Sequence, residues 1–214
     1  MEKSKKKYTL KVIKILEKNF GDVKCALNFS TPFELLVAVI LSAQCTDERV
    51  NKVTENVFKR YKNINDYAKA DILEFEKHII STGFFRNKAK NIISSAQLIT
   101  DNYDGVVPQT MEELLVLPGV ARKTANVVLG SAFGIMDGIA VDTHVIRIAN
   151  LLRLTKYDDP VKIEKDLMKV APKEYWIKFS FYIQTLGRRI CRARNPNHSA
   201  CPLNKICPAV CKRL

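Results

Sequence analysis

A string at residues 117–126 combines a tight turn with basic residues, and it reads Leu-Pro-Gly-Val-Ala-Arg-Lys-Thr-Ala-Asn. Pro118 and Gly119 predict the turn, and the residues after it predict a helix that begins at once, which is typical of a helix-hairpin-helix. The backbone N–H groups of such a turn and the positive end of the helix dipole together form a site for a phosphate. The alternative is an ordinary turn between two helices.

Lys123 falls in the first turn of the predicted helix, where the helix dipole and the neighbouring Arg122 disfavour a second positive charge. An amine in its neutral form can attack a carbonyl-like carbon, such as the anomeric carbon of a sugar. A lysine at such a position is, taken alone, more often a phosphate contact. Lys123 is therefore a candidate nucleophile whose role depends on a second group.

A second string, Val-Asp-Thr-His at residues 141–144, supplies a carboxylate. Asp142 is predicted to cap the N-terminus of a helix. A carboxylate fixed at a helix start can cap that helix and also stabilise the sugar cation that forms as a base leaves. His144 would lie in the first turn, as a phosphate contact or as an ordinary surface residue.

The six cysteines are distributed unevenly. In a reducing compartment they are not expected to form disulfides. Four of them crowd into a proline-containing tail without helical periodicity, namely Cys191, Cys201, Cys207 and Cys211. A metal site is expected to order this tail. Cys25 and Cys45 lie apart from it and are interpreted as small buried hydrophobic residues.

The elements that position these residues are predicted to be helices throughout, because apolar residues recur at helical spacing and two-residue alternation is nearly absent. Thr31 with Glu34 forms a predicted capping box, with Pro32 at the first helical position, and two similar starts follow at residues 71 and 110. Further helices are expected at 8–19, 47–61, 87–101, 122–133, 143–152, 160–170 and 175–190. The chain is thus assigned to the all-α class.

The chain is strongly basic, with 35 Lys and Arg against 22 Asp and Glu and a net charge of +13. Such a charge points to a polyanion, usually nucleic acid, although a ribosomal or membrane-surface protein would share it. No segment has the roughly 20 uninterrupted apolar residues that a transmembrane helix needs, and no signal-peptide core follows the N-terminal lysines. A cytoplasmic, nucleoid-associated monomer without membrane contact is expected.

Several strings, taken in order, resemble those of the endonuclease III family in the helix-hairpin-helix DNA glycosylase superfamily. They are Leu-Ser-Ala-Gln-Cys-Thr-Asp at 41–47, Thr-Gly-Phe-Phe-Arg-Asn-Lys-Ala at 82–89, the hairpin, Val-Asp-Thr-His at 141–144 and the cysteine tail. The resemblance covers nearly the whole chain. It implies a bifunctional enzyme that binds double-stranded DNA containing damaged bases or abasic sites. Such an enzyme excises oxidised pyrimidines and cleaves the strand at the abasic site by β-elimination through a lysine Schiff base.

The resemblance also implies roles for single residues. Lys123 would be the Schiff-base nucleophile and Asp142 the catalytic carboxylate. Gln44 would fill the hole left by the flipped nucleotide, and Phe84 would wedge into the opposite strand, unless it is a core aromatic. The remaining DNA contacts would be Gly119, Ala121, Arg122 and His144. Ala121 departs from the family, which usually has glycine there, so a requirement for positive φ at this position would be unfavourable.

The resemblance further implies a [4Fe–4S] cluster, with cysteines spaced by six, two and five residues. Cys191, Cys201 and Cys207 match three of the ligands, but His198 occupies the second position. Cys211, with three residues between it and Cys207, is the preferred fourth ligand because thiolates bind such clusters more often than imidazoles. His198 is the alternative ligand, and zinc is the alternative metal.

Two discontinuous helical lobes are implied as well: a six-helix barrel lobe with the hairpin at 27–137, and an iron-sulfur lobe from 1–26 and 138–214, with a DNA-binding cleft between them. Two rival functions stay open. One is a monofunctional glycosylase in which Lys123 only contacts phosphate. The other is a non-enzymatic, metal-stabilised DNA-binding protein, which gives Asp142 no purpose.

Overall fold

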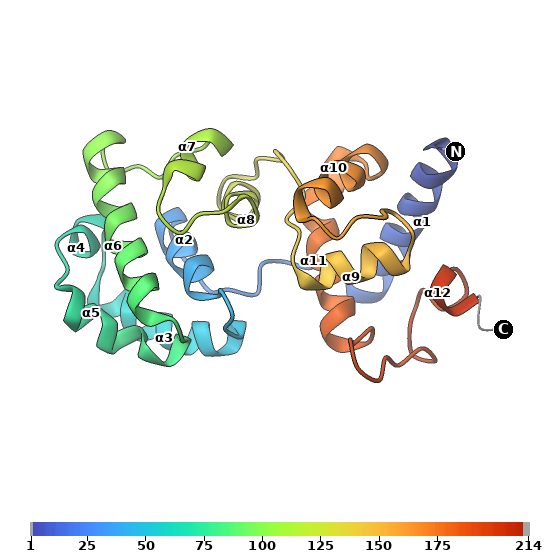
Figure 1. Cartoon of the computed structure of the whole chain (residues 1–214), viewed down its shortest axis with the longest axis horizontal. Helices are drawn as coiled ribbons and strands as arrows, with labels where there is room; N and C mark the ends of the chain where they lie inside the picture. The colour runs from blue at the N-terminus through green and yellow to red at the C-terminus, as the bar shows by residue number, and fades with distance from the viewer. Residues whose placement is uncertain (1, 212–214) are drawn as a thin grey trace. The chain divides into compact units, whose positions relative to one another are not determined.

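The computed structural model describes residues 2–211, the last of them by its backbone alone, and every regular element in this part of the chain is a helix. The prediction of an all-α fold is confirmed (Figure 1). Contacts between elements divide the chain into two units, one of residues 25–137 and the other of residues 1–24 with 138–214. No helix in the described part is long and apolar enough to cross a bilayer.

The unit of residues 25–137 carries the hairpin. Its elements are α2 (Pro32–Leu41), α3 (Asp47–Arg60), α4 (Ile64–Ala68), α5 (Ile72–Ile79), the 3-10 helix η1 (Ile80–Thr82), α6 (Phe85–Asn102), α7 (Met111–Val116) and α8 (Arg122–Phe133).

Helix α2 is the centre of this unit. Residues 35–41 are all buried, and α2 packs against α3, α6 and α8. A helix that is apolar all round requires cover on every side. Its start is fixed by the predicted capping box, since Thr31 accepts from the Glu34 N–H and Glu34 accepts from the Thr31 N–H.

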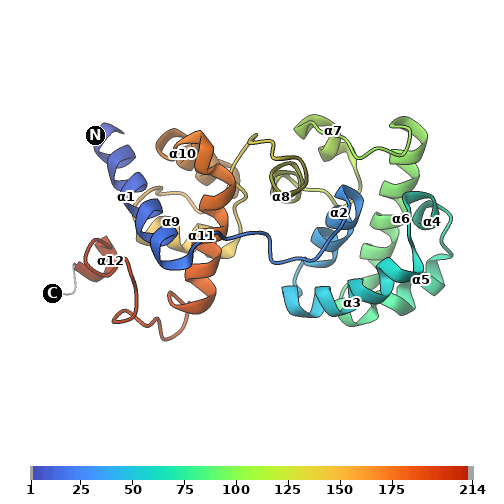
Figure 2. The ribbon, with the colours of Figure 1, turned by 180° about the vertical axis from the view of Figure 1, so that it is seen from behind.

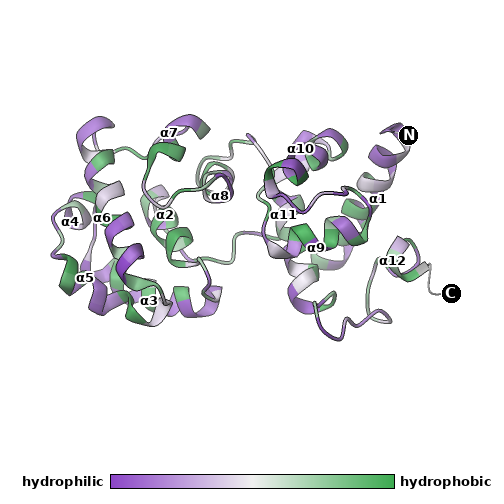
Figure 3. Ribbon diagram, in the orientation of Figure 1, coloured by the Kyte–Doolittle hydropathy of each residue, from purple (hydrophilic) through white to green (hydrophobic). Residues whose placement is uncertain are grey.

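Helices α3, α5 and α6 are amphipathic, and Figure 3 shows purple and green alternating along them. Aromatic side chains of this unit gather around Tyr67 of α4, which is buried. Tyr67 contacts the rings of Phe33, Tyr61 and Phe75 at centroid distances of 5.1, 5.2 and 5.9 Å. Offset and edge-on contacts of this kind stabilise a core beyond the area they bury.

The second unit joins the beginning of the chain to its end. Its elements are α1 (Glu2–Phe20), α9 (Thr143–Leu151), α10 (Pro160–Val170), the 3-10 helix η2 (Lys173–Tyr175), α11 (Trp176–Arg189) and α12 (Pro208–Cys211). Helix α1 packs against α10 and α11, and α9 packs against α11 (Figure 2). Leu16, Ile148 and Phe179 are buried in the shared core.

Two helices, α8 and α10, have the predicted bounds. The start of α10 is marked by a side-chain cap, because Asp159 accepts a hydrogen bond from the Lys162 N–H. Helix α1 begins at Glu2 instead of Tyr8, because lysine is a good helix former and Lys6 pairs with Glu2 one turn away at 3.1 Å. The short helix α12 in the cysteine tail was not predicted.

Candidate functional site

The predicted hairpin is formed by α7, a turn and α8. Gly119 has φ of 77°, and the Val120 N–H donates to the Leu117 carbonyl at 3.1 Å to close the turn. A Cβ on Gly119 would lie 2.7 Å from Asn91 Nδ2 and 2.9 Å from Asn91 Cβ, both on α6. Glycine is therefore needed at this position for the backbone angle and for the close approach of α6.

Helix α6 holds the hairpin in a second way. Ser95 Oγ donates to the Pro118 carbonyl at 2.9 Å, one turn further along the same face as Asn91. The turn thus rests on α6 through one polar bond and one close packing contact. Side chains at positions i and i+4 share a helix face, which is why both reach the turn.

Ala121 is the N-cap residue of α8, with φ of −95° and ψ of 169°. This is extended backbone that alanine adopts freely, so the departure from glycine causes no strain, and the positive φ lies at Gly119 instead. Within the described chain no side chain caps α8. Backbone N–H groups at a helix start without a side-chain cap can bind a phosphate, which is the role that the sequence predicts for this hairpin.

Lys123 lies in the first turn of α8 and is half-buried. The sequence did not suggest that Lys123 and Asp47 both act electrostatically on the thiol of Cys25. Burial raises the pKa of the Cys25 thiol, the Asp47 carboxylate raises this pKa further and the Lys123 ammonium lowers it. Both charges are therefore electrostatic neighbours of the thiol. Asp47 is the last residue of the string at 41–47, and its place in that string is the sequence feature that could have indicated it.

Gln44 and Phe84 share an unusual backbone geometry, with φ of 53° and 49°. Both are exposed, and Phe84 has 63% of its surface accessible. Phe84 is therefore not a core aromatic. Residues other than glycine rarely adopt positive φ, and such strained positions concentrate at ligand clamps and active sites.

Asp142 is the N-cap of α9, as predicted, and one carboxylate oxygen accepts from the Val145 N–H at 2.9 Å. The segment before it is buried and anchored, because Ser180 Oγ on α11 donates to the Ala140 carbonyl at 2.8 Å. Asp142 and Lys123 belong to different units of the chain.

His144 lies in the first turn of α9 and is half-buried against α11. A Cβ on Gly187 would lie 2.5 Å from His144 Nδ1 and 3.1 Å from His144 Cβ. The glycine thus lets the two helices approach at the end of α9 that carries Asp142. Arg122 lies in the first turn of α8 and is half-buried.

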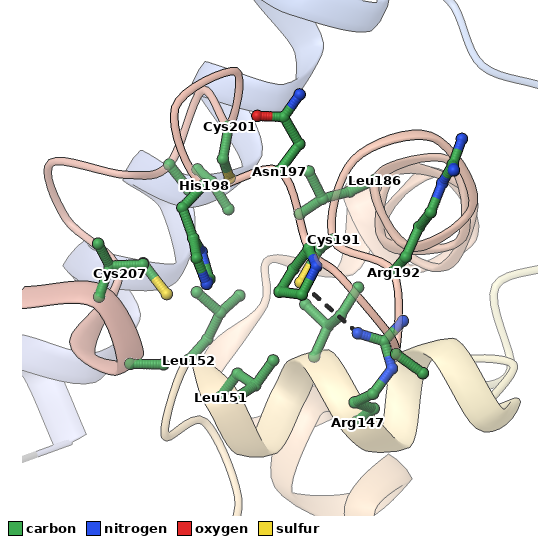
Figure 4. Close-up of a pocket in the computed structure, with 16 residues that line it drawn as sticks. Arg147, Leu151, Leu152, Leu186, Cys191, Arg192, Asn197, His198, Cys201 and Cys207 are labelled. Carbon is green, nitrogen blue, oxygen red and sulfur yellow. Dashed lines mark hydrogen bonds between the residues drawn. The ribbon is translucent and has the colours of Figure 1, made fainter. Parts of the chain in front are cut away.

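The cysteine tail surrounds a cavity of about 320 Å³ beside α9 and α11. Cys191, Cys201, Cys207 and His198 line it, and the His198 ring lies in the space between Cys191 and Cys207 (Figure 4). Arg147 Nη1 donates to Cys191 Sγ at 3.6 Å. Burial raises the pKa of the Cys201 thiol, and the thiols of Cys191 and Cys207 raise it further.

These donors fit an iron-sulfur cluster. Among the described side chains, no three His, Cys, Asp or Glu groups converge closely enough to hold one metal ion. Three of the four donors that line the cavity are thiols, which are the usual ligands of an iron-sulfur cluster. The preferred fourth ligand, Cys211, lies outside the residues whose side chains are described.

Comparisons with known proteins agree with this geometry. Residues 37–173 match the HhH-GPD superfamily of base excision DNA repair proteins, and residues 191–207 match the iron-sulfur binding domain of endonuclease III. The endonuclease III of Synechocystis sp. is 54% identical over 96% of this chain and 94% of its own length, and that of Bacillus subtilis is 46% identical over 88% and 86%. A solved endonuclease III, trapped as a covalent intermediate with DNA, has a TM-score of 0.91 at 44% identity and covers 97% of this chain and 98% of its own.

The hairpin and the helical fold thus define an HhH-GPD base excision DNA repair protein. Within that superfamily, the chain belongs to the endonuclease III family. The cofactor of the cysteine tail is accordingly a [4Fe–4S] cluster and not zinc.

Proposed function

We propose that this enzyme, a DNA glycosylase and abasic-site lyase of base excision repair, removes oxidised pyrimidines from double-stranded DNA with Lys123 as its nucleophile. The observation that carries the assignment is the position of Lys123, in the first turn of a helix that opens directly from the phosphate-binding hairpin. The likeness to an endonuclease III trapped as a covalent intermediate with DNA supports an enzyme that bonds to its substrate.

The proposed reaction has two stages. Lys123 Nζ, as a neutral amine, attacks C1′ of the damaged nucleotide, and the base leaves with the electrons of the glycosidic bond and takes up a proton. The sugar ring then opens to give a Schiff base between Nζ and C1′. Loss of a proton from C2′ breaks the bond from C3′ to the 3′-phosphate oxygen, and hydrolysis of the imine returns the free amine.

Asp142 is proposed to act in the first stage. As the base leaves, positive charge develops on the sugar, and a carboxylate stabilises that cation and assists the proton transfers. The Val145 N–H bond fixes the carboxylate at the start of α9. The residue therefore meets two requirements at once, the helix cap and the charge.

Gln44 and Phe84 are proposed to enter the duplex when the damaged nucleotide is extruded. Extrusion costs a few kcal/mol of unstacking and unpairing, which inserted side chains partly offset. Gly119, Ala121 and Arg122 would bind phosphate at the hairpin, and His144 would add a contact from α9. We further propose that the enzyme acts as a monomer and that it acts on DNA in the cytoplasmic nucleoid.

The cluster is proposed to be held by Cys191, Cys201, Cys207 and Cys211. Excision and β-elimination transfer no electrons between enzyme and substrate, so the cluster orders a tail that has little apolar core of its own. The backbone of α12 places residue 211 one helical turn after Cys207. His198, which lines the cavity, is the competing fourth ligand.

Borohydride trapping tests substrate, chemistry and nucleophile together. The reagent reduces the imine to an amine, so wild type and a duplex with one oxidised pyrimidine should give a stable adduct. Lys123→Gln should give none while it keeps its helical circular dichroism. Undiminished trapping by that variant would remove Lys123 from the role, and base release without any adduct in wild type would favour a monofunctional enzyme.

A further inference from the structure

Lys88 is a buried lysine that the proposed chemistry does not use. It lies in the first turn of α6 and is 4% exposed. Lysines are almost never fully buried unless their ammonium is paired, because removing the charge from water costs free energy. Burial accordingly lowers the pKa of this side chain.

The hydrogen bonds of Lys88 join two separate segments. Its Nζ donates to the carbonyl of Leu41 at 2.8 Å and to the carbonyl of Thr82 at 2.8 Å. Leu41 is the last residue of α2, and Thr82 is the last residue of η1. Carbonyls at helix ends have no partner within the helix, and a cation is favoured there by the dipole. One ammonium therefore ties two helix ends to the start of a third helix.

Each of these carbonyls lies two or three residues before one of the exposed residues with positive φ. Gln44 follows Leu41 by three residues, and Phe84 follows Thr82 by two. Positive φ at a non-glycine residue persists only where the surrounding structure holds it. The contact with Lys88 fixes the backbone at the point where both turns begin.

We propose that Lys88 is a positioning residue that holds the Gln44 loop and the Phe84 turn in fixed register, so that both side chains enter the duplex together. This inference rests on the proposed function, since it takes Gln44 and Phe84 as the residues that replace the extruded nucleotide. Insertion from a preordered backbone costs less conformational entropy than insertion from mobile loops. The two loops are distant in sequence, so a shared anchor couples them.

Lys88→Met removes the donors while it keeps a long, apolar side chain. Lys90→Met on the exposed face of α6 is the matched control, with the same change of charge. The substrates are a duplex with one oxidised pyrimidine, which requires extrusion, and a single-stranded oligonucleotide with a preformed abasic site, which does not. We expect kcat/KM on the duplex to fall by about 10- to 100-fold for Lys88→Met, with cleavage of the single strand unchanged.

A double-mutant cycle distinguishes the proposed positioning role of Lys88 from a purely structural role. Phe84→Ala should lower duplex excision, and adding Lys88→Met to it should cost much less than Lys88→Met costs in wild type, because the wedge is already lost. The fluorescence of a 2-aminopurine beside the lesion, which rises on unstacking, should rise less in Lys88→Met. Should that variant not fold, Lys88→Gln carries the same tests, since its shorter amide cannot reach both carbonyls.

Three results would overturn the inference: wild-type kcat/KM on the duplex, equal losses on both substrates, or fully multiplicative effects in the cycle. The proposed function fails differently. Wild type would then cleave neither substrate and form no borohydride adduct, and the positioning role would fall with it.

Discussion

At the scale of single residues, Asp142 has two roles that an alanine substitution removes together. Its carboxylate accepts a bond from the Val145 N–H and so caps α9, and the proposed chemistry needs the negative charge of the same group. Replacement by alanine removes both. A loss of activity in that variant would leave open whether the helix or the charge matters.

Serine separates the two roles of Asp142, because it caps helices about as well as aspartate but carries no charge. We expect Asp142→Ser to keep its unfolding free energy within about 0.5 kcal/mol of wild type, whereas Asp142→Ala loses about 1 kcal/mol. Both should slow base excision by about 10²- to 10⁴-fold in single-turnover assays. Wild-type excision by the serine variant would reduce Asp142 to a cap.

At the scale of elements, α6 organises the part of the molecule proposed to enter DNA. Its N-cap is Phe84, its first turn carries Lys88, and its next turns hold the hairpin through Asn91 and Ser95. The proposed wedge, the proposed anchor of the two loops and the turn proposed to bind phosphate thus share one rigid support. Sites built on helices are held more accurately than sites built on loops alone.

The packing of α9 on α11 predicts how Gly187→Ala changes the free energy of unfolding, and the sign of that change depends on His144. Alanine at position 187 gains about 1 kcal/mol of helix propensity over glycine, but overpacking against His144 costs about 1–3 kcal/mol. The near atoms include His144 Cβ, so rotating the ring gives little relief. Gly187→Ala should therefore destabilise the protein.

In a His144→Gly background the same Gly187→Ala change should instead stabilise the protein, because the clashing atoms, Cβ included, are gone and the propensity gain remains. Urea denaturation of the four proteins in this cycle measures both signs. If Gly187→Ala stabilises both backgrounds equally, the close approach of α9 and α11 does not constrain this position.

Within the cysteine tail, substitutions can test which residue is the fourth cluster ligand. If Cys211 is the ligand, purified Cys211→Ser should lose most of its iron and acid-labile sulfide, and His198→Ala should keep both and stay brown. Thiolate is the more common ligand, whereas the His198 ring already lies in the cavity. The opposite pattern would assign a Cys3His cluster. Cys25→Ser is the matched control, a cysteine outside the tail.

At the scale of the whole molecule, the sequence predicted what depends on local chemistry. Caps at Thr31 and Asp142, the Pro-Gly turn and the helical periodicity all act within a few residues, and the structure confirms each of them. The family model and the relatives confirm the family and its cofactor.

Contacts between distant segments could not be predicted in this way. The bonds from Lys88 to two helix ends, the support of the hairpin by Asn91, and the charges around Cys25 all join residues far apart in the chain. A lysine in the first turn of an amphipathic helix gives no local sign of burial. Which residues meet is decided by packing, and one sequence does not fix that.

The net charge of +13 is a property of the whole molecule, and salt should act on it in two opposite directions. Self-repulsion destabilises a compact basic protein, so raising salt should raise its melting temperature. DNA binding releases condensed counterions, so affinity for undamaged duplex should fall, with a log-log slope of about −0.9 for each phosphate neutralised. Fluorescence anisotropy and thermal denaturation over one salt series measure both. A fall in affinity together with a rise in melting temperature excludes salt-induced unfolding as its cause. An affinity that does not change with salt would contradict phosphate-dominated binding.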